Sequence, residues 1–79
     1  MKNASEFKCL TSLVGLKVRT LREFCQIPVG TIGTVVEHYE GRGHEGIMVE
    51  WKTPTGHLIR DGFGRDRDFD ETKYLEVID

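Results

Sequence analysis

Three acidic residues alternate in the segment DRDFDE, with the spacing of the first ligands of a calcium-binding loop. Asp66, Asp68 and Asp70 fit those first ligand positions. An EF-hand loop would then require Gly and a bidentate Glu where the chain has Glu71 and Val77, and a strand-like pattern follows where a helix is needed. We therefore expect no calcium site. The segment is interpreted as a solvated loop in which Asp70 begins a short helical or 3-10 turn.

The histidines and cysteines do not have the spacing of a metal site or of an activated nucleophile. The three histidines are His38, His44 and His57, and they match no recognised ligand pair, so a shared site would require the hairpins to converge. Cys9 and Cys25 form no CxxC motif, and no base stands near Cys25 at a catalytic spacing. We expect exposed histidines, free thiols, no cofactor or metal, and no enzymatic activity.

Aromatic and arginine side chains in the segment DGFGRDRDFDET are the best candidates for binding. An aromatic residue among arginines is typical of contacts with a protein or with a stacked base. Here each arginine alternates with an aspartate, which cancels the positive charge that a phosphate backbone requires. Phe63 has a second interpretation, as a hydrophobic anchor of the loop. Together with side chains of the central hairpin, the predicted partner-binding residues are Tyr39, Arg42, His44, Phe63, Arg65, Arg67 and Phe69.

Short strands separated by turns must position these residues. No window shows the sustained recurrence of apolar residues typical of a long helix, whereas β-branched residues alternate between glycine- and proline-rich turns. The expected strands are 16–22, 31–40, 46–53, 56–60 and 73–78, with a polar loop over 61–72. Residues 1–13 are expected to form a tail or one short turn, and residues 14–79 one domain. The expected core includes Val18, Val35, Val49, Leu58, Leu75 and Val77, with Trp51 on the face of Ile47 and Val49.

Two glycines in the segment PVGTIGTVVE mark the start of the second predicted strand. Gly30 follows Pro28 and Val29, where a turn requires positive φ. Gly33 is expected where that strand bends or bulges. A Cβ atom at either glycine is predicted to meet the neighbouring strand.

Composition limits the classes of function. With 79 residues, 38% hydrophobic and 30% charged, the chain has the composition of a small globular domain. The net charge is −2, from +3 over residues 1–36 and −5 over residues 37–79, so a basic and an acidic face are expected. No apolar run reaches the roughly 18 residues of a membrane span, and the first residues lack a secretory pattern, so we expect a cytoplasmic protein without membrane contact.

Several short motifs resemble those of the small SH3-like β-barrels. GLKVRTLREFCQIPVGTIGTVV, GIMVEW and YLEVI follow the layout of that superfamily, and Gly30, Gly33 and Val35 resemble the GxxGxV element of KOW domains. The layout is also similar to one of the small proteins of photosystem I and to the variable chain of ferredoxin-thioredoxin reductase. The resemblance implies an all-β barrel of about five antiparallel strands that docks on another macromolecule. Glu37 and Glu40 depart from KOW domains, where basic residues would help to hold RNA.

Together these features predict a non-catalytic docking or adaptor module that binds a protein as part of a larger complex. The alternative is a KOW-like module that binds RNA or the ribosome through the basic first strand, with Lys17, Arg19 and Arg22. The oligomeric state stays open.

Overall fold

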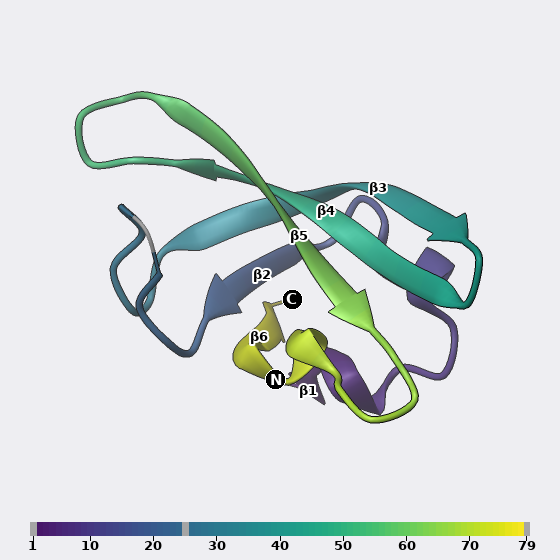
Figure 1. Cartoon of the computed structure of the whole chain (residues 1–79). Coiled ribbons are helices and arrows are strands. Elements are labelled where there is room, and N and C mark those ends of the chain that lie inside the picture. Colours follow the sequence, from purple (N-terminus) through teal and green to yellow (C-terminus); the bar gives the residue numbers. More distant parts are fainter. Residues whose placement is uncertain (1, 25, 79) are drawn as a thin grey trace.

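The computed structural model describes residues 2–24 and 26–78 and shows an all-β fold (Figure 1). Six strands form one antiparallel sheet in the order β1-β6-β2-β3-β4-β5. Their bounds are β1 Lys2–Asn3, β2 Lys17–Thr20, β3 Ile32–Gly41, β4 His44–Lys52, β5 Leu58–Arg65 and β6 Leu75–Ile78. Within the described ranges the helices are short 3-10 turns, η1 (Ala4–Glu6), η2 (Leu10–Leu13) and η3 (Glu71–Tyr74), and none of them is long and apolar enough to cross a membrane.

The long strands β3, β4 and β5 form a meander that carries most of the sheet. Val35 pairs with Val49, both buried, and the buried Trp51 pairs with the partly buried Ile59, so core-facing residues of neighbouring strands stand side by side. The register shifts between Val35 and Glu37, which marks a β-bulge in β3. Because the bulge adds one residue, it changes which positions of β3 face the core. Simple alternation along the sequence therefore gives the wrong face beyond it.

The core is built around an aromatic cluster. Trp51 is fully buried and makes edge-to-face contacts with Phe24 and Phe63, with ring centroids 5.6 Å and 6.2 Å away. The predicted core position of Trp51 is confirmed, as are those of Val18, Val35, Val49, Leu75 and Val77. The prediction for Leu58 is wrong: it is 66% exposed, because it pairs with Lys52 on the outer face of the sheet.

The N-terminal segment contributes to both the sheet and the core. Residues 2–3 form β1 against β6, and the side chain of Asn3 caps η1 by accepting from the Ser5 amide. The helical turns bury Ala4, Leu10 and Leu13 completely. The described part of residues 1–13 is thus neither a tail nor a single short turn, because it contributes a strand and two packed 3-10 turns. The sheet of the described residues has six strands, whereas about five are expected from the sequence. The additional strand, β1, has only two residues, which is too short to produce an alternating pattern in the sequence.

The two glycines at the start of β3 serve different needs. Gly30 has φ of +89°, as predicted for a turn, but nothing lies within 4 Å of the position that a Cβ atom would take, so the predicted clash there is wrong. At Gly33 a Cβ atom would lie 2.5 Å from Trp51 Cε3 and 2.7 Å from the Glu50 carbonyl oxygen. The predicted close approach at Gly33 is confirmed. The bulge itself lies further along β3.

Candidate functional site

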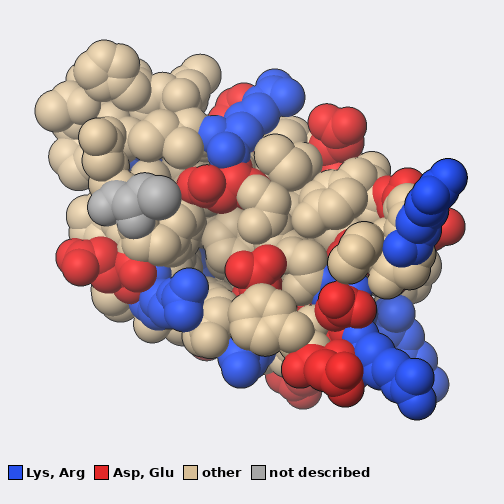
Figure 2. All heavy atoms as spheres, in the orientation of Figure 1, with Lys and Arg blue, Asp and Glu red and all other residues tan. Residues whose placement is uncertain are grey.

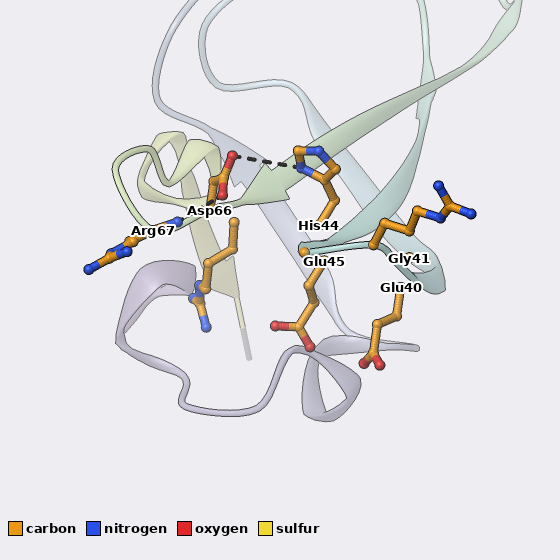
Figure 3. A pocket seen from close by; sticks show the side chains of 9 residues that line it. Glu40, Gly41, His44, Glu45, Asp66 and Arg67 are labelled. Atoms are coloured by element: carbon orange, nitrogen blue, oxygen red, sulfur yellow. Dashed lines mark hydrogen bonds and ion pairs between the residues drawn. The ribbon is translucent and has the colours of Figure 1, made fainter.

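The β3–β4 hairpin and the turn after β5 meet at one end of the sheet. Arg42 and Gly43 alone connect β3 to β4, and Gly43 adopts the φ of +77° that such a tight turn needs. Because Glu45 pairs with Arg65, the end of β5 lies beside the hairpin. His44 Nδ1 lies 3.7 Å from Asp66 Oδ2 and links the two segments (Figure 3). We call this region the hairpin–loop surface; its predicted binding residues are Tyr39, Arg42, His44, Arg67 and Phe69.

The turn after β5 is held by its own hydrogen bonds. The Asp66 amide donates to the Phe69 carbonyl at 2.6 Å, and the Arg67 amide donates to Asp66 Oδ1 at 2.9 Å. Asp70 accepts from the Thr72 amide at 3.0 Å and starts η3, as the sequence predicts. This local bonding fixes the backbone of the turn while leaving Arg67 and Phe69 exposed. The acidic residues Asp66 and Asp70 are thus engaged in local structure.

Two adjoining hollows mark the surface. The first, of about 420 Å³, lies between the hairpin and the turn, and Figure 3 shows His44 and Asp66 facing each other across it. The second, of about 430 Å³, is lined by both exposed aromatic residues, Tyr39 and Phe69. His44, Glu45, Arg65 and Asp66 line both hollows. The structure therefore brings together the two segments that the sequence predicts to bind, with an aromatic hollow between them.

Glycines on the neighbouring strands β4 and β5 lie against the Tyr39 ring. A Cβ atom on Gly46 would collide with the Tyr39 ring and would lie 2.8 Å from the Phe63 carbonyl oxygen. Cβ atoms on Gly62 and Gly64 would also lie within 4 Å of the Tyr39 hydroxyl. The phenol ring thus lies along a channel of glycines on β4 and β5. The sequence signal for this channel is the spacing GxG at residues 62–64 opposite Gly46, a spacing that is also typical of loops.

The prediction that residues 61–72 form one loop is wrong for its first part, because β5 continues to Arg65. Phe63 is therefore not a surface contact. It is only 6% exposed and packs against Phe24 and Trp51, which agrees with its alternative interpretation as an anchor. The glycines on either side of Phe63 belong to β5, and a Cβ atom on Gly62 would lie only 3.3 Å from both the Tyr39 hydroxyl and Met48 Sδ, whereas one on Gly64 would make ordinary contacts.

Arg65 is also placed differently from the prediction of a partner contact. Its side chain is 19% exposed and its guanidinium bonds to Asp70 Oδ2 at 3.1 Å. Nη1 donates to the Phe7 carbonyl at 2.6 Å, and Nη2 donates to the Ala4 carbonyl at 3.3 Å. β1 and β5 are the two edge strands of the sheet. Arg65 ends β5 and bonds to the segment that follows β1, so it links the two edges. Its main contacts are structural.

Charges of both signs are mixed on the face shown in Figure 2, and this face is neither purely basic nor purely acidic. Among the basic residues of β2 and its following turn, Arg19 pairs with Glu76 and Arg22 lies over the Tyr74 ring, 4.0 Å from its centroid. Lys17 is exposed. The predicted basic strand is therefore partly neutralised or covered by contacts within the domain.

Cys9 is an exposed free thiol, while Cys25 lies outside the described residues. The Thr11 hydroxyl, 2.7 Å from Cys9 Sγ, and the Thr11 backbone lower the pKa of this thiol below its ordinary value, because their hydrogen bonds favour the thiolate. The negative charge of Glu45 opposes this shift.

One group of neighbouring side chains is not predicted by the sequence patterns. The predicted exposure holds for His44 and His57, but the His38 side chain is 17% exposed, and its Nε2 lies 3.0 Å from Glu45 Oε2. Together with Glu40 these residues place three potential metal-ligand atoms within 4.8 Å of one another. The sequence feature that could have predicted this group is the spacing of His38 and Glu40, two residues apart, together with a two-residue turn that places Glu45 opposite Glu40.

No protein-family model matches this chain, no curated protein is similar to it at a significant level, and no solved structure matches it significantly. The resemblance to SH3-like barrels and KOW domains thus stays a prediction that rests on short motifs.

Proposed function

We propose that this domain is a non-catalytic docking module that binds another protein through the hairpin–loop surface. The observation that carries the proposal is the convergence of Tyr39 and Phe69, from segments far apart in the sequence, on one hollow. They are 37% and 52% exposed, whereas the aromatic residues Phe24, Trp51 and Phe63 form the internal cluster. Exposed aromatic side chains beside a hollow are typical anchors of protein interfaces.

The arrangement favours a protein ligand on energetic grounds. The turn Asp66–Phe69 and the hairpin are already ordered by backbone hydrogen bonds, so little conformational entropy is lost when a partner binds. Arg42, Arg67, Asp66 and Glu71 surround the hollows with both signs of charge. Mixed charges at a rim select a complementary partner and orient it. We therefore expect the partner to insert an apolar or aromatic side chain between Tyr39 and Phe69 and to present polar groups to this rim.

The alternative, an RNA-binding module, has weaker support. Its three basic residues are Lys17, Arg19 and Arg22, of which Arg19 pairs with Glu76 and Arg22 stacks on Tyr74. Phosphate binding would have to compete with both contacts. The mixed charges around the hollows would also repel part of a phosphate backbone.

The test is site-directed photocrosslinking in the native cell. A photoreactive amino acid at position 69 should crosslink a specific protein, whereas the same amino acid at position 58, which is even more exposed but lies at the end of β5 far from this turn, should not. The identified protein is then purified, and its affinity for the domain is measured. Phe69→Ala should weaken binding by about tenfold or more, and Arg67→Ala should weaken it by a smaller factor.

Leu58→Ala is the matched control, since it removes an exposed apolar side chain outside the surface. It should leave the affinity unchanged, and all three variants should retain the wild-type melting temperature. Crosslinking at position 58 but not 69 contradicts the proposal. RNA binding at about 0.15 M salt that is lost in Lys17→Ala and kept in Phe69→Ala would instead support the alternative.

A further inference from the structure

Three side chains that could bind a metal ion project from the same face of the β3–β4 hairpin. His38 and Glu40 are two residues apart on β3, so their side chains share a face. Glu40 pairs directly with Glu45 of β4, so Glu45 shares that face too. Figure 3 shows Glu40 and Glu45 directed to the same side of the hairpin, toward the N-terminal segment. The hairpin register alone therefore gathers one imidazole and two carboxylates.

The distances suit a small divalent ion. His38 Nε2 lies 3.0 Å from Glu45 Oε2, and the three ligand atoms lie within 4.8 Å of one another. Ligand atoms around a tetrahedral Zn²⁺ with bonds of about 2.0–2.2 Å stand roughly 3.4 Å apart. Glu40 is exposed, so its side chain is free to adopt another rotamer when an ion binds.

Charge at this face provides a second reason for a cation to bind. Glu40 and Glu45 stand directly opposite each other on neighbouring strands, an arrangement in which like charges destabilise a sheet. Arg65 is the partner of Glu45 on β5, but its guanidinium bonds to Asp70 and to the carbonyls of Ala4 and Phe7. The guanidinium of Arg65, the cationic group paired with Glu45 in the strand register, is therefore already engaged in other hydrogen bonds. A bound divalent ion would relieve the repulsion between the two glutamates.

We propose that His38, Glu40 and Glu45 bind a divalent transition-metal ion of the Zn²⁺ type, through one imidazole nitrogen and two carboxylates. An imidazole ligand selects such ions over Mg²⁺ and Ca²⁺, which prefer oxygen ligands alone. Three protein ligands leave a coordination position open to water or to a group from another molecule. The site lies at the border of the first hollow, which Glu40 and Glu45 also line.

The test is titration of the isolated domain with Zn²⁺, followed by the backbone amide shifts of each residue. We expect saturable shifts centred on residues 38–40 and 45, and none at the acidic turn of residues 66–70. Mg²⁺ at the same concentrations should cause no saturable shift. Because no partner is needed, the result is independent of the proposed docking function.

Substitutions distinguish this site from other zinc ligands in the chain. Loss of an outer-shell partner of a metal site already costs about 10- to 100-fold in affinity, so His38→Gln should weaken Zn²⁺ binding by at least about tenfold. Glu40→Gln should weaken it too, and because Glu40 is exposed this variant tests the site without risk to the fold. His44→Gln is the matched control on the same hairpin and should bind Zn²⁺ with wild-type affinity.

Three results would overturn the assignment. One is binding that survives both His38→Gln and Glu40→Gln. Another is binding that is abolished by Cys9→Ser or Cys25→Ser while His38→Gln has no effect, which would identify a thiol site. The last is a Mg²⁺ response equal to that of Zn²⁺, which would indicate general screening of acidic charge.

Discussion

Residues 58–65 and residues 66–70 carry similar side chains but perform different tasks. Each segment holds a phenylalanine, an arginine and an aspartate. In β5, Phe63 is buried and Arg65 bonds to the N-terminal segment, whereas in the following turn Arg67 and Phe69 are exposed. The difference arises from backbone pairing: β5 is tied to β4 over its whole length, while the turn bonds mainly to itself. Residue type alone therefore does not separate buried structural residues from exposed ones here.

The two phenylalanines give the largest contrast. Phe63→Ala should lower the free energy of unfolding by about 3–5 kcal/mol, because it leaves a cavity beside Trp51 and Phe24. Phe69→Ala should change it by less than about 0.5 kcal/mol, since the side chain is half exposed. Urea denaturation of both variants measures the difference. An equal loss of unfolding free energy in the two variants would contradict the difference between a structural β5 and an exposed turn.

Substitution of the arginine in β5 should also lower the free energy of unfolding more than substitution of the arginine in the turn, but the difference should be smaller than for the phenylalanines. Arg65→Met keeps much of the aliphatic side chain and removes the bonds to Asp70 and to the Phe7 and Ala4 carbonyls. We expect a loss of about 2–3 kcal/mol, because partly buried polar groups lose charged hydrogen-bond donors.

Arg67→Met is the control for Arg65→Met, since Arg67 is exposed at the tip of the turn, and its effect should stay within about 0.5 kcal/mol. Thermal and urea unfolding provide the measurement. Amide hydrogen exchange of residues 4–7 should also accelerate in Arg65→Met alone. Unchanged exchange there would show that Arg65 does not hold the N-terminal segment.

Two glycines at opposite ends of β3 allow the same comparison between a tightly packed and an open position. Gly33→Val should destabilise the domain by about 1–3 kcal/mol, because its Cβ would enter the space of Trp51 and of the Glu50 carbonyl. Gly41→Val, at the other end of β3, meets open space and should cost less than about 0.5 kcal/mol. A thermal melt of Gly33→Val that matches wild type would contradict the close packing at that position.

Local patterns predicted the parts of the fold that depend on neighbouring residues. Alternation of β-branched residues indicated the main strands and the buried face of Val35, Val49 and Trp51, because side chains of a strand point alternately to opposite faces. The turn at Gly30 and the start of η3 at Asp70 were also predictable, since both depend on backbone preferences of one or two residues.

Other features depended on contacts between segments that are distant in the sequence. The bulge after Val35 changed the faces of His38 and Glu40, and only the register with β4 shows that they meet Glu45. Gly62 and Gly64 resemble a loop in the sequence, and only their pairing with Met48 and Gly46 of β4 shows that they belong to a strand.

The sequence by itself determined an all-β chain with a small apolar core and two polar segments. It could do so because strand periodicity, turn chemistry and composition act over a few neighbouring residues. Tertiary structure alone decided that Phe63 and Arg65 are structural, that Tyr39 and Phe69 share one hollow, and that three potential metal ligands lie on one face of a hairpin. These outcomes depend on strand register, and a shift of one residue would send each of these side chains to the opposite face of the sheet.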